Sequence, residues 1–364
     1  MDMVKKEYAA LFGSMKLPLM LGIVLIHCRY NTTDFPILRQ SRFAVGDYVM
    51  SLFSDSLATV CVPLFFLISG FFFFYGVEKF SWRIYVGKLR RRVGTLLIPY
   101  LLWNLIGFGM LLLKKTAFFS GLAAPPDESV GLLKLFLLSF WSLSSVLPSG
   151  GAYPADFPLW FIRNLIIIVV FTPPVLYLML KRVKWLAIVL LMIVEYFYNT
   201  HGLLYFSIGA SVALLDIRKL SAFIGRYGWV FFVAYLVTTA VMAANDEYAI
   251  LLAFPMIISG IIGLIWMAKQ LNLADNKLIA RWQSASFFIF AFHGLFCSFL
   301  RRAWLKLIIP QTSLSLVVCY VLSFCSMVMI CLLVQKMVKM AFPRVLAVLT
   351  GNRSAGMPVS TIGR

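Results

Sequence analysis

The sequence predicts an all-α protein, a polytopic membrane helical bundle with about ten transmembrane helices. Hydrophobic residues make up 62% of the 364-residue chain and charged residues only 13%, which is far from the proportions of soluble domains. One soluble core cannot bury so large an apolar fraction, and in lipid only helices and closed barrels satisfy their backbone polar groups. The apolar runs are continuous and do not alternate, which favours helices over barrel strands.

Apolar segments long enough to form buried or membrane-spanning helices follow one another along the whole chain. A shorter eleventh candidate, residues 131–147, precedes a loop rich in proline and glycine. The ten clear segments are residues 9–28, 56–76, 95–113, 159–180, 185–198, 202–215, 228–244, 248–268, 284–300 and 314–340.

The basic residues predict how these segments cross the membrane, because cytoplasmic loops are enriched in lysine and arginine. If residues 131–147 do not span, every basic loop but one falls on the side of the N-terminus. We therefore expect both termini in the cytoplasm, with 131–147 interfacial or re-entrant on the outer side. The exceptional group contains Arg301, Arg302 and Lys306, and it is expected either to anchor the rim or to face the site.

The formal net charge of +19 raises nucleic acid as a partner in a soluble protein. Here the cytoplasmic loops explain the excess, and part of it is available to an anionic substrate or cofactor. We expect membrane lipid and no nucleic acid as partner, a multi-pass place in the inner (plasma) membrane, and leave homo-oligomerisation open. The predicted domains are a transmembrane domain, residues 1–342, and a short basic cytoplasmic tail, residues 343–364.

The cysteines and the N-terminus do not suggest secretion. Five of the six cysteines lie in apolar segments and none forms a CxxC pair, so small buried side chains are expected instead of a disulfide framework or zinc site. His27, Cys28 and Arg29 follow the first apolar run where a signal peptide would have a small-residue cleavage site. We therefore expect a retained first helix.

Lys16 and His27 bracket an otherwise apolar stretch of this first helix. Eleven residues at 100° each bring the two side chains to the same face, about 16 Å apart along the axis. Ionisable groups within a membrane are costly and are functional candidates by default. A histidine near its reference pKa suits proton removal from an alcohol. The alternative is a hydrogen-bonded polar group inside the bundle, and Asp55, Glu195 or His201 could orient the ring.

A basic cluster, Lys88 with Arg90, Arg91 and Arg92, stands where the third segment leaves the cytoplasmic surface. It is expected either to anchor the helix or to bind phosphate, because the guanidinium fork suits phosphate oxygens. A cytosolic donor such as coenzyme A would need such a cluster.

Other polar groups fall within or at the ends of helices. His293 lies mid-span in the ninth segment, either holding helices together or facing a site, with no second ligand at metal-binding spacing. The topology gathers further groups at the outer ends of helices, namely His27, Arg29, Asp55, Trp160, Arg163, Asn164, Glu195 and His201. We expect Trp160, Arg163, Glu195 and His293 to contact substrate and expect no metal.

Five short motifs follow one another in the chain, and together they resemble the acyltransferase 3 family of integral membrane acyltransferases. The resemblance runs from about residue 14 to residue 300. Its motifs are Lys16 with His27, Pro63 to Phe71 (PLFFLISGF), Arg90 to Arg92 leading to Pro99 and Tyr100, Leu159 to Phe161 (LWF), and His293.

This resemblance implies transfer of an acyl group, commonly acetyl from acetyl-CoA, to a hydroxyl of a glycan, lipid-linked sugar or small molecule. By this analogy His27 is the general base, Lys16 assists the donor or His27, and the basic cluster holds the phosphates of coenzyme A, a substrate and not a permanently bound cofactor. Lys16 replaces the commoner arginine and so lacks its bidentate fork. Without a C-terminal hydrolase-like domain, transfer is expected to finish in the membrane domain or on another protein.

The sequence predicts an O-acetyltransferase that modifies a surface polysaccharide or its lipid-linked precursor. Two alternatives stay open at this point. One keeps the fold but uses a longer acyl group or a small-molecule acceptor. The other is a transporter of a lipid-linked sugar or an anion, which would bind no acyl-CoA.

Overall fold

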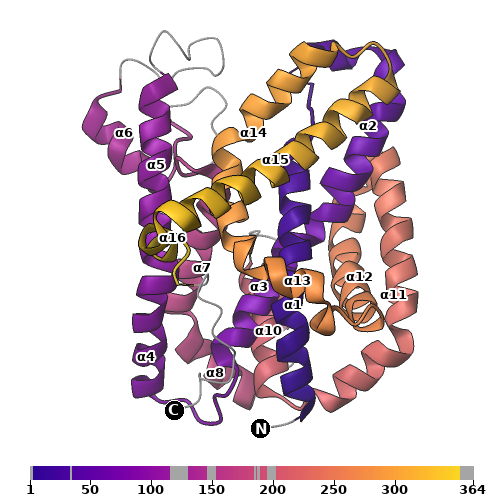
Figure 1. Ribbon diagram of the computed structural model, residues 1–364. Helices are drawn as coiled ribbons and strands as arrows, with labels where there is room; N and C mark the ends of the chain where they lie inside the picture. The colour runs from indigo at the N-terminus through magenta and orange to yellow at the C-terminus, as the bar shows by residue number, and fades with distance from the viewer. Residues whose placement is uncertain are drawn as a thin grey trace. The chain divides into compact units, whose positions relative to one another are not determined.

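The computed structural model describes residues 3–32, 35–114, 130–145, 153–183, 186, 189–194 and 202–352. These residues form helices and connecting turns with no strand, which confirms the predicted all-α fold (Figure 1). The α-helices are α1 (Met3–Cys28), α2 (Ala44–Met50), α3 (Cys61–Phe74), α4 (Trp82–Arg92), α5 (Ile98–Lys114), α6 (Leu132–Ser139), α7 (Trp160–Phe171), α8 (Pro173–Arg182), α10 (Leu203–Leu214), α11 (Arg218–Ala244), α12 (Ala249–Gln270), α13 (Lys277–Trp282), α14 (Ser286–Ile308), α15 (Ser313–Ala341) and α16 (Pro343–Leu349).

Within the described part of the chain, seven helical stretches are long and apolar enough to cross a membrane. The pair α7 and α8, broken at Thr172 before two prolines, makes up to eight, because proline and the residue before it disfavour helix continuation. The shorter apolar helix α10 accounts for a ninth predicted segment. Half of the remaining segment, 185–198, falls outside the described residues. The seven stretches are Met3–Cys28, Ser41–Phe74, Trp82–Leu113, Arg218–Ala244, Leu251–Gln270, Lys277–Ile308 and Ser313–Ala341.

Several helices extend beyond their apolar segments. The first was predicted from residue 9 but begins at Met3, because polar side chains near its start find partners. Lys5 Nζ donates to the carbonyl of Ala213 at 2.7 Å. Lys269 Nζ lies 2.9 Å from Glu7 Oε1.

The helices form two compact units. Unit 1 contains residues 1–82, 171–283 and 303–325, and unit 2 contains residues 83–170, 284–302 and 326–364. The long helices α14 and α15 therefore contribute residues to both units.

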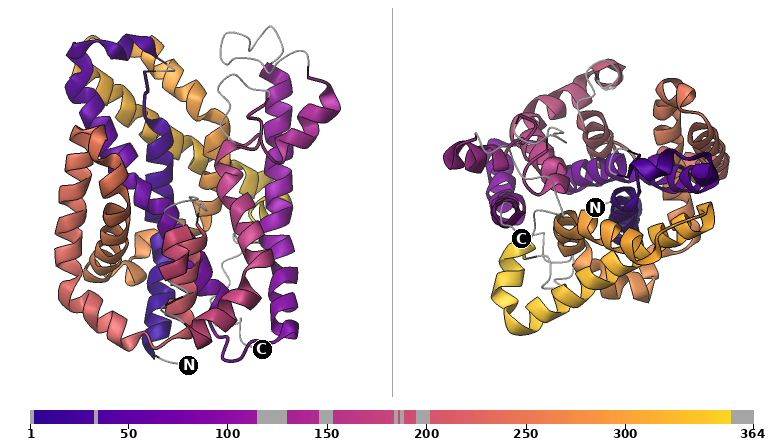
Figure 2. Two further views of the ribbon diagram at one scale, coloured as in Figure 1. Left: turned by 180° about the vertical axis from the view of Figure 1, so that it is seen from behind. Right: turned by 90° about the horizontal axis from the view of Figure 1, so that it is seen from above.

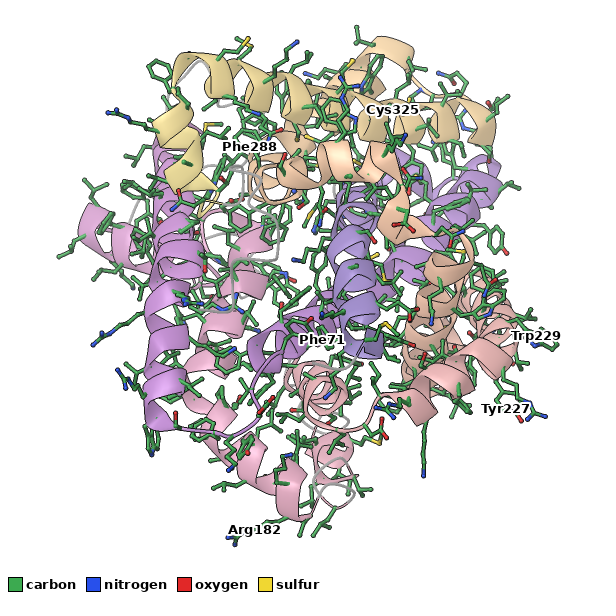
Figure 3. The ribbon with its side chains drawn as sticks, turned by 60° about the horizontal axis from the view of Figure 1, so that its bottom comes forward. Phe71, Arg182, Tyr227, Trp229, Phe288 and Cys325 are labelled. Atoms are coloured by element: carbon green, nitrogen blue, oxygen red, sulfur yellow. The ribbon has the colours of Figure 1, made fainter. Side chains whose placement is uncertain are left out.

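In unit 1, α3 and α10 pack with their backbones in contact. A Cβ atom at Gly70 would overlap the carbonyl of Phe206, and one at Gly209 would overlap the carbonyl of Leu67. Phe71 lies inside the unit (Figure 3). Its ring centroid is 5.0 Å from the ring centroid of Phe12 on α1. The absence of a side chain at Gly70 and Gly209 therefore allows the two backbones to approach closely.

The helices α11 and α12 of unit 1 form an antiparallel pair (Figure 2). A Cβ atom at Gly263 would lie 2.6 Å from the Cα atom of Phe232, so these backbones also approach closely. Tyr227 and Trp229 project outward from α11 (Figure 3). Exposed apolar and aromatic side chains on this helix suit contact with lipid and its interface.

In unit 2, α4 continues through a π-helical turn, Val93–Leu97, into α5. Leu111 of α5 packs in a buried cluster with Leu135 of α6 and with Leu143. With eight residues, α6 rises only about 12 Å, which is less than the thickness of a bilayer; the interfacial or re-entrant placement of residues 131–147 stays a prediction.

The final described helix, α16, packs on α5 in unit 2. Trp103 Nε1 donates to the carbonyl of Leu349 at 3.0 Å. Gly351 follows with φ at +61°, and a Cβ atom there would lie 2.8 Å from Thr95. Residues 343–352 of the predicted tail are thus part of unit 2, and residues 353–364 lie outside the described chain.

Candidate functional site

Lys16 and His27 lie on the single continuous helix α1 of unit 1. Both side chains are half-buried. The Nζ atom of Lys16 lies 4.5 Å from the ring centroid of Phe72 on α3. This cation–π contact holds the charge against protein instead of lipid.

An ion-pair cluster adjoins His27 at the end of α1. Arg29 Nη2 lies 3.1 Å from Asp47 Oδ1 on α2, and Arg29 Nη1 pairs with Asp55 Oδ2. Asp55, one of three groups considered as a partner for the ring of His27, is therefore engaged by Arg29. The other two, Glu195 and His201, lie outside the described residues, so the substrate role of Glu195 stays a prediction.

A second set of hydrogen bonds reaches the same end of α1. It starts from a π-helical turn, Ser51–Ser56, which no feature of the sequence had indicated. Ser54 Oγ donates to the carbonyl of Leu25 at 2.8 Å and lies 2.7 Å from the hydroxyl of Tyr320. Such π-turns often occur at functional sites.

The predicted phosphate-binding residues lie on α4 in unit 2. Lys88 and Arg92 are one helical turn apart and half-buried, whereas Arg90 and Arg91 are exposed. Like charges at this spacing repel one another. A bound anion would relieve that repulsion, so the buried pair is the better phosphate candidate.

Trp160 and Arg163 occupy the first turn of α7. The guanidinium of Arg163 lies 5.1 Å from the ring centroid of Trp141 and donates to its carbonyl. Arg163 Nε also donates to Asn164 Oδ1 at 3.2 Å. Arg163 therefore holds the segment that follows α6 against α7. Its role in substrate binding stays a prediction.

His293 of α14 is fully buried in unit 2. Its Nδ1 atom lies 3.0 Å from the carbonyl of Ile289. A carbonyl only accepts hydrogen bonds, so Nδ1 carries the proton in this arrangement. The ring centroid lies 6.4 Å from that of Phe157 and 6.3 Å from that of Phe290.

The structure adds a residue that the sequence did not single out, Asp156. Its carboxyl group is buried beside α14, where a Cβ atom at Gly294 would lie 2.6 Å from Asp156 Oδ1. The backbone N–H of Asp156 donates to Asn104 Oδ1 at 3.2 Å, and Asn104 Nδ2 donates to the carbonyl of Tyr100. Neither carboxyl oxygen has a hydrogen-bond partner among the described residues. Burial therefore raises the pKa of Asp156 well above that of an ordinary carboxyl.

The candidate residues thus fall in both units. Lys16 and His27 belong to unit 1, and Lys88, the three arginines, Trp160, Arg163 and His293 belong to unit 2. Across the described ranges, no group of three or more His, Cys, Asp or Glu side chains is arranged to hold a metal ion.

Comparison with known proteins gives a family match and a curated relative. Residues 14–335 match the acyltransferase 3 family, described as an acyltransferase domain. The chain is 24% identical to the succinoglycan biosynthesis protein ExoH of Rhizobium meliloti (strain 1021), over 97% of this chain and 95% of that protein. No solved structure matches.

The family match covers most of the chain and includes Lys16, His27, the basic cluster and His293. It also covers the apolar stretches that could span a membrane, from residue 14 within the first to residue 335 within the last. The chain therefore belongs to the acyltransferase 3 family of multi-pass membrane acyltransferases.

Proposed function

We propose that this protein is an O-acetyltransferase that transfers acetyl from acetyl-CoA to a hydroxyl of a surface polysaccharide or its lipid-linked precursor. The relative named for succinoglycan biosynthesis supports the polysaccharide acceptor. The observation that carries the proposal is the half-buried pair, Lys16 and His27, on one helix of a membrane acyltransferase.

In the proposed reaction the acceptor hydroxyl oxygen bonds to the thioester carbonyl carbon while His27 takes the hydroxyl proton. The carbon–sulfur bond then breaks and coenzyme A leaves as the thiolate. A neutral imidazole with a pKa near the working pH suits this proton transfer. Lys16 assists by placing a positive charge near the donor or near His27.

Donor and acceptor contacts complete the proposal. The phosphates of coenzyme A are bound by Lys88, Arg90, Arg91 and Arg92. Trp160, Arg163, Glu195 and His293 contact the acceptor or the acyl group. The protein acts in the inner membrane with both termini in the cytoplasm, so the donor reaches it from the cytosol.

The test measures transfer of labelled acetyl from acetyl-CoA by purified protein to polysaccharide taken from a deletion strain. His27→Ala is expected to lower the initial rate by about 100-fold or more, as loss of a general base does. Cys325→Ser, at an exposed free cysteine, serves as the matched control. Full transfer by the His27→Ala protein would exclude His27 as the base.

The identity of the acyl group needs a separate comparison. Unlabelled acetyl-CoA should compete with the labelled donor more effectively than longer or charged acyl-CoA compounds do. Preference for one of these compounds would exclude acetyl while keeping the acyltransferase activity. Absence of any acyl-CoA binding would instead favour the transporter alternative.

A further inference from the structure

The carbonyl groups at the end of α1 need partners outside the helix. Because α1 ends at Cys28, its last four carbonyls cannot all accept bonds from following helical N–H groups. The N–H of Arg29 bonds the carbonyl of Ile26 at 3.4 Å. The carbonyl of Leu25 accepts from Ser54 Oγ at 2.8 Å. Ser54 thus caps the helical turn that carries His27.

Ser54 is itself held by a second hydroxyl. A serine has a single hydroxyl proton, and Ser54 gives it to Leu25, so the hydroxyl of Tyr320 donates to Ser54 at 2.7 Å. Ser54 and Tyr320 are both buried. This chain of bonds therefore joins α15 to the end of α1 through two buried hydroxyl groups, and a hydrogen bond between buried groups is stronger than one in water.

The neighbour of Ser54 in the π-helical turn provides a second anchor. Asp55 pairs with Arg29, whose other terminal nitrogen lies 3.1 Å from Asp47. Two adjacent residues of one turn therefore contact the chain two residues before and two residues after His27, at Leu25 in α1 and at Arg29 just beyond its end. The π-helical turn therefore presents Ser54 to the end of α1 and Asp55 to the residue that follows the helix.

A third contact lies just beyond. The hydroxyl of Tyr30 is 2.8 Å from Ser323 Oγ on α15. Tyr30 and Ser323 are buried. The residues on both sides of His27 thus contact α2, the π-turn and α15, through the backbone at Leu25 and through the side chains of Arg29 and Tyr30.

We propose that Ser54, Asp55 and Tyr320 are positioning residues that hold His27 in place for acyl transfer. This inference rests on the proposed role of His27 as the base. Misplacement of a reacting group by about 1 Å can lower a rate by about 100-fold. The anchors therefore affect the rate of the chemical step more than the binding of acetyl-CoA.

The kinetic test compares Ser54→Ala and Tyr320→Phe with Ser56→Ala. Ser56 is buried in the same π-turn but makes no hydrogen bond to α1 within the described residues, so it is the matched control. Ser54→Ala is expected to lower kcat about 10- to 100-fold, with KM for acetyl-CoA changed less than about 3-fold. The Tyr320→Phe protein should show a smaller loss, and the double variant should be no worse than Ser54→Ala alone.

A spectroscopic test is independent of activity. The chain has three histidines, so an NMR spectrum of the protein with isotope-labelled histidine shows few imidazole signals. The signal that disappears in the His27→Gln protein is that of His27. Ser54→Ala and Tyr320→Phe should shift or broaden this signal, and Ser56→Ala should not. An unchanged His27 signal in the Ser54→Ala protein would overturn the inference, as would a changed signal with wild-type kcat.

The two proposals can fail separately. If His27→Ala keeps full transfer while Ser54→Ala alters the His27 signal, His27 is not the base. Ser54 then still positions His27, but this has no role in catalysis. If His27→Ala abolishes transfer while Ser54→Ala behaves as wild type, the positioning role fails and the proposed function stands.

Discussion

Asp156 is the residue whose environment differs most from what its sequence suggests. It stands in a loop rich in proline, glycine and small residues, where an exposed carboxylate would be expected. Its burial depends on Asn104 of α5 and Gly294 of α14, which are distant in sequence. A tertiary contact of this kind leaves no local pattern, so the sequence could not predict it.

The raised pKa of Asp156 predicts a pH-dependent stability. The folded protein binds the Asp156 proton more tightly than the unfolded chain does, so stability falls as pH rises above about 4. Asp156→Asn removes this titration while keeping the shape of the group. The apparent melting temperature of the wild type in detergent should therefore fall more between pH 5 and pH 8 than that of the variant. Parallel changes in the two proteins would contradict a buried, hard-to-ionise carboxyl.

Packing of the basic helix α4 distinguishes between residues that the sequence alone treats as one cluster. The sequence identified Lys88 and the three arginines but not which of them face the protein. That depends on packing against the rest of unit 2, which leaves Lys88 and Arg92 half-buried and Arg90 and Arg91 exposed. Charges shielded from water interact with a bound anion more strongly than exposed ones.

This difference predicts unequal effects on donor binding. Arg92→Gln is expected to raise the KM for acetyl-CoA about 10-fold, whereas Arg90→Gln, the matched exposed control, should change it less than about 3-fold. Acetyl-CoA and the same donor without its 3′-phosphate would show which phosphate is bound. A variant that has lost the contact with the 3′-phosphate should no longer discriminate between these two donors. Equal effects of both substitutions would show that helix face does not decide phosphate binding.

The contact between α3 and α10 depends on glycine at an element interface. Gly70→Val would place a side chain where the carbonyl of Phe206 lies, and forced overpacking typically costs about 1–3 kcal/mol. Thermal unfolding in detergent should show a clear loss of apparent melting temperature. Gly87→Ala on α4 is the control, since a Cβ there meets no atom within 4 Å. A Gly70→Val protein as stable as the wild type would refute the close packing.

For the molecule as a whole, the sequence predicted the helical fold and the positions of most of its helices. The helical fold follows from continuous apolar runs, and nine of the ten segments correspond to helices of the described chain. The shared placement of Lys16 and His27 on one helix follows from their spacing alone. These features depend on residues close together in the sequence.

Other features depend on contacts between distant residues and were not predictable. The π-turn at Ser51–Ser56 contains Ser54, which forms a hydrogen bond with α1, and no residue pattern predicts this turn. The helix α16 lies in a stretch that the sequence suggested only as a tail, and Trp103 of α5 binds its end. The division into two units likewise reflects which helices pack together, not their order.

The proposed mechanism requires Lys16 and His27 to act together in acyl transfer. Its most direct test measures acetyl transfer from labelled acetyl-CoA by Lys16→Met, His27→Ala and the double variant, with Lys16→Arg as the charge-keeping control. If the two residues act as a unit, each single loss should be severe and the double variant no worse than His27→Ala alone. Wild-type transfer by His27→Ala, or losses that multiply fully in the double variant, would contradict this mechanism.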